Sequence, residues 1–262
     1  MSIIKTFSAS SVETFFDCKL KFKFRYIDRL KIKVVKDLST CFGEAFHLLI
    51  EKFWKSNSYN KQFMLDNWVE TFDTIVKQHN PLAIGSKDYT RYLNSGFPLI
   101  ERFYLHQQLN DLLCESDAIE GKENLKYKEF IIIAKIDRIA KGIIIDYKTN
   151  MRTKSQEEVD KSIQLTFYSY TYRIVSGKIE NGLCLHYLRN NDVIYTKRDT
   201  DDYNKLLKII DDIAEYCDNN NEFEPKRGGD ACKWCEYVSQ CNEYINGNKD
   251  IAKKLEFTLG TW

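Results

Sequence analysis

One stretch of the chain, residues 130–150, constrains the fold more than any other. Its sequence, FIIIAKIDRIAKGIIIDYKTN, contains two runs rich in isoleucine on either side of Lys141-Gly142. Isoleucine favours β-strands, and glycine supplies the positive φ that a two-residue hairpin turn needs. With the turn centred there, the numbers of facing residues sum to 283, so Asp137 is predicted to lie opposite Asp146.

Two carboxylates that face each other across a hairpin repel, and burying both without a partner costs free energy. Their Cβ atoms would be roughly 4.5–5.5 Å apart, and a bound divalent cation would relieve the repulsion, because Mg²⁺ takes one or two carboxylates and keeps several waters. Lys148, two residues beyond Asp146, is predicted to point to the same face, where it would stabilise charge on a reacting phosphate or lower the pKa of an attacking water. The alternative is that Lys148 simply pairs with one aspartate at an edge of the sheet.

These residues resemble the signature of the PD-(D/E)xK nuclease superfamily, in its Asp-x(n)-(Asp/Glu)-x-Lys form. Asp137 and the triplet Asp146-Tyr147-Lys148 match this pattern. IDRIA…IIIDYKT is similar to the RecB-type and AddB-type exonuclease domains and to the CRISPR-associated adaptation nucleases. One departure is Ala134, where those relatives often carry glycine. The resemblance implies an α/β, restriction-endonuclease-like fold with a mixed central β-sheet flanked by helices.

Two helical stretches carry further matches. FGEAFHLLIEKFW resembles the Gly-x-x-x-His helix of these nucleases, with Gly43 and His47 at the matching spacing, which implies that His47 is a metal ligand. Imidazole suits Mn²⁺ better than Mg²⁺. QLTFYSY resembles their Gln-x-x-x-Tyr motif, which implies that Gln164 and Tyr168, four apart on one helix face, contact DNA beside the active centre. Taken alone, His47 would be an ordinary surface or core histidine, and Tyr168 a member of an aromatic core stripe.

The eight cysteines lack the density of a disulfide scaffold, and in a reducing cytosol a tight cysteine cluster indicates metal or redox chemistry. Cys232, Cys235 and Cys241 form C-x2-C-x5-C, which leaves a tetrahedral site one ligand short. Cys18 is the candidate fourth ligand, because SASSVETFFDCKLKF resembles the N-terminal segment of iron–sulfur nucleases. Four thiolates fit [4Fe–4S] or Zn²⁺, and the resemblance favours iron. Such a site would join the N- and C-terminal segments and constrain the unfolded chain.

Caps and periodicity predict the other elements. Ser10 and Glu13 have capping-box spacing, so a helix is predicted to begin there. KLKFKFRYI alternates like a strand, but the corresponding segment of the relatives is helical, and we expect a helix. Strands are predicted over 127–149, 181–188 and 192–198, and helices over 42–55, 61–79, 88–112 with an interruption at Pro98, 156–176 and 201–217.

No internal repeat and no Pro-, Gly- or Ser-rich linker marks a domain boundary. We therefore expect residues 1–262 to form a single nuclease domain. Residues 1–125 would supply a helical part with Cys18 and His47, residues 126–200 the catalytic β core, and residues 201–262 a helix and the cluster-binding segment.

Charge limits the classes of function. Lys and Arg number 39 against 38 Asp and Glu, and a net charge of +1 argues against a protein that coats nucleic acid by bulk attraction. Between Lys19 and Lys36, however, eight basic residues accompany one acidic residue, so a local basic groove is compatible with the sequence. No apolar run approaches the ~18–20 residues that span a bilayer, and the N-terminus does not resemble a signal peptide. A cytoplasmic protein without membrane contact is expected.

The resemblance implies a metal-dependent DNA exonuclease that prefers single-stranded ends. His47, Asp137, Asp146 and the Tyr147 carbonyl would hold Mg²⁺ or Mn²⁺, and Lys148 would act on the attacking water. No phosphate-binding loop of an ATP-driven motor is visible, so processive work on duplex DNA would need a helicase partner or DNA ends already opened. An integrase is the other candidate partner. DNA recombination and repair, mobile-element processing and CRISPR adaptation are all compatible contexts. The alternative is a non-catalytic DNA-binding subunit of a helicase–nuclease or integration complex.

Overall fold

The computed structural model describes residues 4–32, 34–219, 222–226, 230–233 and 235–246. Contacts divide the chain into two compact units. The first unit comprises Met1–Val34, Leu125–Ile133 and Asp201–Trp262, and the second comprises Val35–Asn124 and Ala134–Thr200. The expected single nuclease domain over residues 1–262 stays a prediction.

The sheet of the second unit is mixed, as the sequence predicted. Strand β3 (Phe130–Ala140), which begins in the first unit, pairs antiparallel with β4 (Ile143–Lys148). Strand β4 pairs parallel with β5 (Gly182–Tyr187), and β5 pairs antiparallel with β6 (Asp192–Thr196). Strand β2 (Ala118–Tyr127), which the sequence analysis missed, also pairs with β3.

The turn between β3 and β4 has the predicted register. Lys141 and Gly142 both have positive φ, 51° and 72°, as a two-residue type I′ turn requires. Arg138 faces Ile145, so the numbers of the paired residues sum to 283. A side chain on Gly142 would also meet the Asn181 amide, because an added Cβ would lie 2.7 Å from Asn181 Nδ2.

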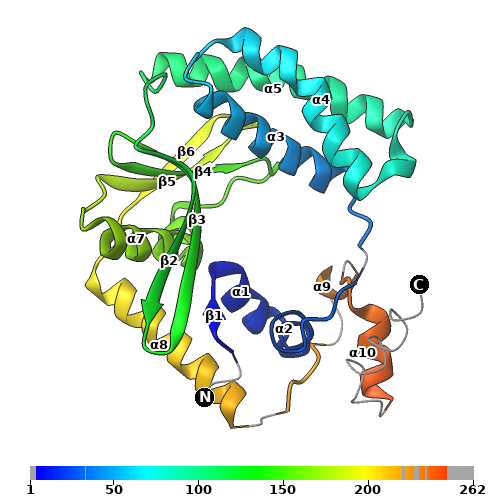
Figure 1. The fold of residues 1–262 in the computed structure, drawn as a ribbon, viewed down its shortest axis with the longest axis vertical. Coiled ribbons are helices and arrows are strands. Elements are labelled where there is room, and N and C mark those ends of the chain that lie inside the picture. Colours follow the sequence, from blue (N-terminus) through cyan, green and yellow to red (C-terminus); the bar gives the residue numbers. More distant parts are fainter. Residues whose placement is uncertain (1–3, 33, 220–221, 227–229, 234, 247–262) are drawn as a thin grey trace. The chain divides into compact units, whose positions relative to one another are not determined.

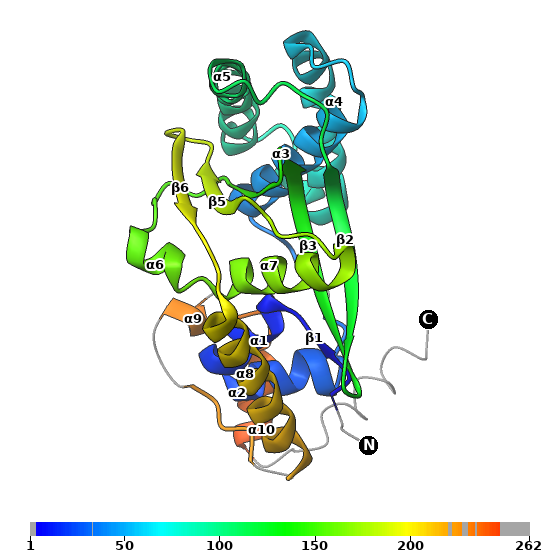
Figure 2. The same cartoon turned by 90° about the vertical axis from the view of Figure 1, so that its left-hand side faces the viewer.

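Helices cover both faces of this sheet. On one face, α3 (Leu38–Lys55), α4 (Lys61–His79) and α5 (Lys87–Leu109) share an aromatic core with Tyr147 of β4 (Figure 1). On the other face, α7 (Ile163–Ser176) packs through its apolar side chains against β3, β4 and β5 (Figure 2). The predicted α/β layering is confirmed.

Three predictions of helix boundaries in the second unit were wrong. The helix predicted over 42–55 begins at Leu38, because the Asp37 side chain caps it by accepting a hydrogen bond from the Thr40 N–H. Helix α5 continues through Pro98. Proline removes one backbone donor, but the buried side chains of the next turn, including Ile100 and Phe103, fix the helix on the core. The helix predicted over 156–176 is divided into α6 (Gln156–Asp160) and α7, because Ser162 caps α7 by accepting a hydrogen bond from the Leu165 N–H.

In the first unit, β1 (Thr6–Phe7) pairs parallel with the beginning of β3. Helix α1 (Ala9–Asp17) starts two residues earlier than predicted, because Ser8 forms the capping box with Ser11. The segment after Cys18 is helical, as the resemblance implied, and forms α2 (Lys19–Phe22) and a π-helical turn, η1 (Lys23–Ile27).

The first unit also contains the helices of the C-terminal part. They are α8 (Thr200–Asp218), α9 (Asp230–Lys233) and α10 (Val238–Ile245). The second unit contains one short 3-10 helix among its described residues, η2 (Pro81–Ala83). Aromatic contacts hold these segments together: Phe15 packs on Tyr216 of α8 with 5.3 Å between ring centroids, and Phe24 packs on Tyr237 at 5.8 Å. None of the helices in the described ranges is long and apolar enough to cross a membrane.

Gly96 allows α4 and α5 to approach closely, and its replacement by alanine is expected to destabilise the second unit. An added Cβ would lie 2.1 Å from Cε2 of Trp68, which is fully buried and donates a hydrogen bond to the Leu93 carbonyl. Overpacking of this kind costs about 1–3 kcal/mol, which exceeds the gain of about 1 kcal/mol in helix propensity. Chemical denaturation would measure the loss. Exposed Asn94→Ala in the same helix is the control, which we expect to keep stability or raise it slightly through helix propensity.

Candidate active site

The backbone pairing of β3 and β4 ends next to the two aspartates. The last pair is Arg138 with Ile145. Beyond it, Oδ2 of Asp137 accepts a hydrogen bond from the Tyr147 N–H at 2.8 Å. The Asp137 carboxylate therefore takes the place of a backbone acceptor on β3, and the direct Asp137–Asp146 pairing that the turn predicted is replaced by this contact.

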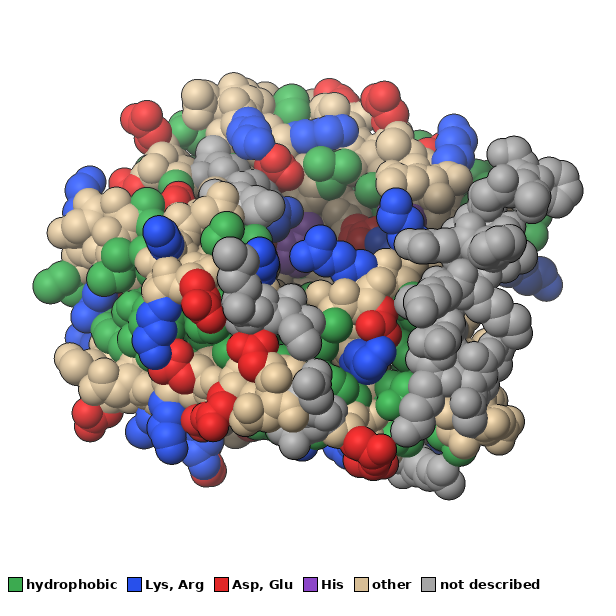
Figure 3. Space-filling view, turned by 60° about the horizontal axis from the view of Figure 1, so that its bottom comes forward, with side chains coloured by type: hydrophobic (Ala, Val, Ile, Leu, Met, Phe, Trp, Pro, Cys, Tyr) green, Lys and Arg blue, Asp and Glu red, His purple; other side chains and the backbone are tan. Residues whose placement is uncertain are grey.

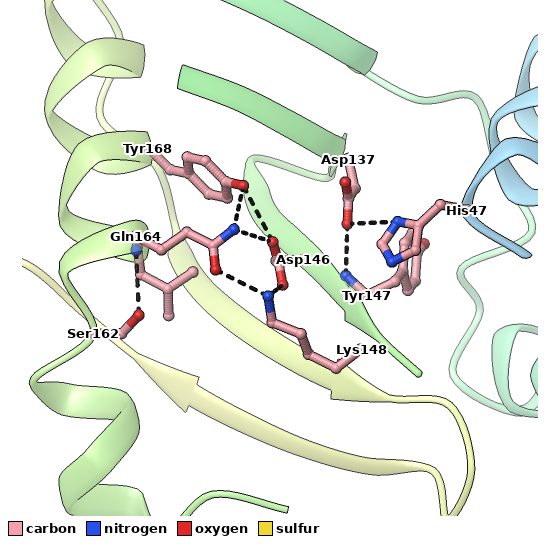
Figure 4. A network of polar contacts seen from close by, with 9 residues as sticks. His47, Asp137, Asp146, Tyr147, Lys148, Ser162, Gln164 and Tyr168 are labelled. Atoms are coloured by element: carbon pink, nitrogen blue, oxygen red, sulfur yellow. Dashed lines mark hydrogen bonds and ion pairs between the residues drawn. The ribbon is translucent and has the colours of Figure 1, made fainter. Parts of the chain in front are cut away.

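Helix α3 brings His47 to Asp137. Nδ1 of His47 lies 3.4 Å from Oδ2 of Asp137 (Figure 4). Gly43, one turn earlier, lets the helix approach the end of β4, because an added Cβ would lie 2.9 Å from Oγ1 of Thr149. Burial alone would lower the pKa of His47, but the hydrogen bond and charge of Asp137, with the charge of Asp146, raise it above its ordinary value.

Asp146 is 2% exposed and is contacted on both carboxylate oxygens. Oδ1 accepts hydrogen bonds from Gln164 Nε2 at 3.0 Å and from the Tyr168 hydroxyl at 3.2 Å. Oδ2 forms an ion pair with Lys148 Nζ at 2.7 Å, and the same ammonium donates to Gln164 Oε1 at 2.9 Å. The side-chain amide of Gln164 thus connects the aspartate, the lysine and the tyrosine, as Figure 4 shows.

The two aspartates have opposite electrostatic environments. Burial raises the pKa of Asp146, and Asp137 adds to the effect, although Lys148 and His47 oppose it. Burial also acts to raise the pKa of Asp137, but the hydrogen bond and charge of His47, the Tyr147 N–H and Lys148 bring it below its ordinary value. The surroundings of Asp137 therefore favour its charged form, whereas burial opposes the charge of Asp146.

The donors fit a divalent cation. Oδ2 of Asp146 is buried and, apart from its ion pair with Lys148, accepts no hydrogen bond from the described residues. Two carboxylates and an imidazole on three elements are the oxygen and nitrogen donors that suit Mn²⁺ or Mg²⁺. Across the described ranges, no three His, Cys, Asp or Glu side chains already converge as a metal-binding group, so His47, Asp137 and Asp146 would have to turn to share one ion.

Four cysteines from the two ends of the chain meet in the first unit. Cys18, Cys232, Cys235 and Cys241 line a cavity of about 420 Å³. Sγ of Cys18 accepts hydrogen bonds from the Lys21 N–H and the Lys226 N–H, each at 3.5 Å. The structure therefore brings together the four cysteines that the sequence singled out, and none of the four is in a disulfide bond.

One polar group at the site, the hydroxyl of Tyr187, was not predicted from the sequence. Tyr187 ends β5 and pairs with Lys148, the last residue of β4. Neither strand encodes the identity of its parallel neighbour, so the pattern of the sequence gives no signal for this contact. The apolar residues of GLCLHY indicate only that this stretch is a buried strand of the sheet.

Gln164 and Tyr168 were predicted to contact DNA, and that role stays a prediction, because their described contacts are with Asp146 and Lys148. Tyr168→Phe removes one hydrogen bond to a carboxylate and is expected to lower kcat about tenfold. DNA affinity should not change, since the hydroxyl belongs to a side chain that is only 6% exposed. Single-turnover kinetics with a binding assay would separate the two effects; a loss confined to DNA affinity would assign Tyr168 to DNA binding instead.

Comparison with known proteins identifies the family of the chain. A sequence model of the PD-(D/E)XK nuclease superfamily matches residues 6–242, and the chain belongs to this superfamily. It is similar to the CRISPR-associated exonuclease Cas4 of Francisella tularensis subsp. novicida (strain U112), with 22% identity over 219 residues that cover 83% of this chain and 85% of that protein. Among solved structures, that of a candidate exonuclease from Eubacterium rectale has a similar fold, with a TM-score of 0.52, 14% identity and 87% of each chain covered.

Proposed function

We propose that this nuclease is a divalent-metal-dependent DNA exonuclease. The observation that carries the proposal is the grouping of two aspartates with His47 and Lys148: His47 contacts Asp137, and Lys148 forms the one ion pair of the buried Asp146 Oδ2, which has no other hydrogen-bond donor among the described residues. His47, Asp137, Asp146 and the Tyr147 carbonyl would hold Mg²⁺ or Mn²⁺. When bound, the ion would supply Lewis-acid stabilisation of the phosphodiester and a lower pKa for the attacking water.

Side chains of the protein would position the attacking water and the metal ligands. Lys148 would orient the attacking water and stabilise negative charge on the phosphate in the transition state. Gln164 fixes the Lys148 ammonium and Oδ1 of Asp146 through the two ends of one amide, so both groups are held before substrate arrives. Tyr168 adds a second donor to the same carboxylate oxygen.

Single-stranded DNA ends are the proposed substrate. The exonuclease name of the similar Francisella protein supports action at an end. On the face in Figure 3, basic side chains are interspersed with acidic ones, so attraction to DNA would be local rather than spread over the surface. Processive work on duplex DNA would need a helicase partner or ends already opened, and an integrase is the other candidate partner. CRISPR adaptation, DNA repair and mobile-element processing in the cytoplasm are contexts that fit this chemistry.

We also propose that Cys18, Cys232, Cys235 and Cys241 bind a structural [4Fe–4S] cluster, with Zn²⁺ as the less favoured occupant. The support is the shared cavity and the two backbone N–H groups that donate to the Cys18 sulfur. Hydrogen bonds to sulfur stabilise the negative charge of thiolate ligands and of cluster sulfides.

A second candidate function is a non-catalytic DNA-binding subunit of a larger complex. One observation favours it: the ion pair between Lys148 and Asp146 neutralises that carboxylate without a metal. A protein that binds DNA in a salt-sensitive way and never cuts it would support this reading.

End-labelled linear DNA tests the proposal. Protein purified without oxygen is incubated with single- or double-stranded DNA in Mn²⁺ or Mg²⁺, beside Asp146→Asn and beside circular single-stranded DNA. We expect wild type to degrade linear single strands, to leave circles intact and to stop when EDTA removes the metal, while Asp146→Asn is inactive. Cleavage of circles would make the protein an endonuclease, and equal cleavage by Asp146→Asn would refute the assigned site.

A further inference from the structure

The hydroxyl of Tyr187 is buried beside the site without a hydrogen bond. Tyr187 is 1% exposed, and its Oη has no hydrogen-bond partner among the described residues. It pairs with Lys148 in the parallel β4–β5 ladder, and paired residues of neighbouring strands project to the same face of a sheet. Tyr187 accordingly packs in the core beneath α7 with Tyr168 and Leu165, on the side of the sheet that carries Asp146 and Lys148.

Lys148 is the neighbour of Tyr187 on the adjacent strand of the ladder. An ammonium group has three N–H donors. Two of them are directed to Asp146 Oδ2 at 2.7 Å and to Gln164 Oε1 at 2.9 Å.

A divalent cation on Asp146 would compete with Lys148 for Oδ2. Two positive groups on one buried oxygen repel strongly in a medium of low dielectric constant. The lysine has a flexible four-carbon stem and can leave Asp146 while its bond to Gln164 is kept. It then needs a new acceptor, and the unpaired Oη of Tyr187 is a buried oxygen on the same face.

We propose, on the basis of the function proposed above, that Tyr187 is a positioning residue that accepts the Lys148 ammonium when a divalent cation occupies Asp146. Lys148 thus has two positions. In the first it neutralises Asp146, and in the second it lies between Gln164 and Tyr187, close to the reacting phosphate. Tyr187 stabilises the second position and thereby favours metal binding.

The test of this role is the Mn²⁺ affinity, measured by calorimetry on the full chain with its cysteine site loaded. Four proteins are compared: wild type, Tyr187→Phe, Lys148→Ala and the double variant. Tyr187→Phe removes one oxygen atom and should weaken Mn²⁺ binding about tenfold, the loss expected for one hydrogen bond to a charged group. Lys148→Ala should bind Mn²⁺ at least as tightly as wild type, because the competing ammonium is gone. In that background Tyr187→Phe should have no further effect, since the tyrosine acts through the lysine.

Thr171→Val is the matched control. Thr171 is a fully buried residue of α7, and its Oγ1 also has no hydrogen bond among the described residues. Its replacement removes a buried hydroxyl of the same kind and should leave Mn²⁺ affinity unchanged. Single-turnover cleavage should fall with Tyr187→Phe at subsaturating Mn²⁺ and recover when Mn²⁺ is raised.

The outcomes distinguish the inference from the function on which it rests. Wild type that neither binds Mn²⁺ nor cleaves DNA would overturn both. Wild type that does both, with Tyr187→Phe equal to wild type in Mn²⁺ affinity, would overturn only the role of Tyr187. A loss of affinity that is equally large in the Lys148→Ala background would also overturn it, because the tyrosine would then act without the lysine.

Discussion

Replacing Lys148 by alanine is expected to lower kcat by about 10²–10³-fold, the range measured when a single group that stabilises transition-state charge is removed. Lys148 is the one described cation that contacts both Asp146 and Gln164. Its loss removes the group that would orient water and stabilise the phosphate. DNA affinity should change little, because one phosphate contact among many is lost.

The fold should survive this substitution. Asp146 would lose its ion pair but keep the hydrogen bonds that Gln164 and Tyr168 donate to Oδ1, and these offset part of the cost of its burial. Single-turnover cleavage and a melting curve measure the two effects. Lys87→Ala, at an exposed lysine that starts α5, is the control; activity in Lys148→Ala equal to this control would remove Lys148 from the mechanism.

Cys18→Ser is expected to remove the bound cluster and to cause the largest loss of stability. The ligand set would join positions 18 and 232, which are 214 apart. If the cluster acts as a cross-link, closing a loop of that length constrains the unfolded chain by about 5 kcal/mol in the chain-entropy treatment of cross-links. Iron analysis and the visible absorption of protein prepared without oxygen would report the cluster, and denaturation would report the stability.

Cys114→Ser is the matched control, because Cys114 is also partly exposed but does not line the cavity. It should keep its iron, its absorption and its melting temperature. Zinc without iron in anaerobically prepared wild type would exclude the iron–sulfur assignment. Iron retained in Cys18→Ser would show that Cys18 is not a ligand.

The catalytic hairpin was predictable because its information is local. Lys141-Gly142 determines the turn type, and the turn determines the register of everything that follows on both strands. The same local rule failed at Asp137, because the carboxylate itself bonds to the Tyr147 N–H and ends the ladder. The alternation of apolar and polar residues does not indicate where a side chain replaces a backbone hydrogen-bond acceptor.

Strands β1 and β2 were missed for a different reason. The residues of β2, AIEGKENLKY, are largely polar, and β1 is only two residues long, so neither has the apolar pattern of a central strand. Pairing with β3, rather than intrinsic preference, makes them strands. The Pro98 error has the same origin, since packing of the following turn outweighed one lost hydrogen bond.

Spacing and resemblance predicted which residues form the site, but they did not predict the hydrogen bonds and ion pairs between those residues. The motifs selected His47, Gln164 and Tyr168, and the structure places all three within one network around Asp146 and its partners. Which atom bonds to which depends on the approach of α3 and α7 to the sheet. Gly43 on α3 and the cap of α7 at Ser162 decide these approaches, and both are tertiary effects.

The central claim is that Asp137 and Asp146 hold a catalytic divalent cation, and Mn²⁺ binding tests it most directly. Mn²⁺ is titrated into wild type, Asp137→Asn and Asp146→Asn, each with its cysteine site loaded and its folding verified. We expect a Mn²⁺ site in wild type whose affinity falls at least about a hundredfold in each variant, since each loses a charged ligand. Undiminished Mn²⁺ binding in both variants, or cleavage of DNA by wild type in EDTA, would contradict it.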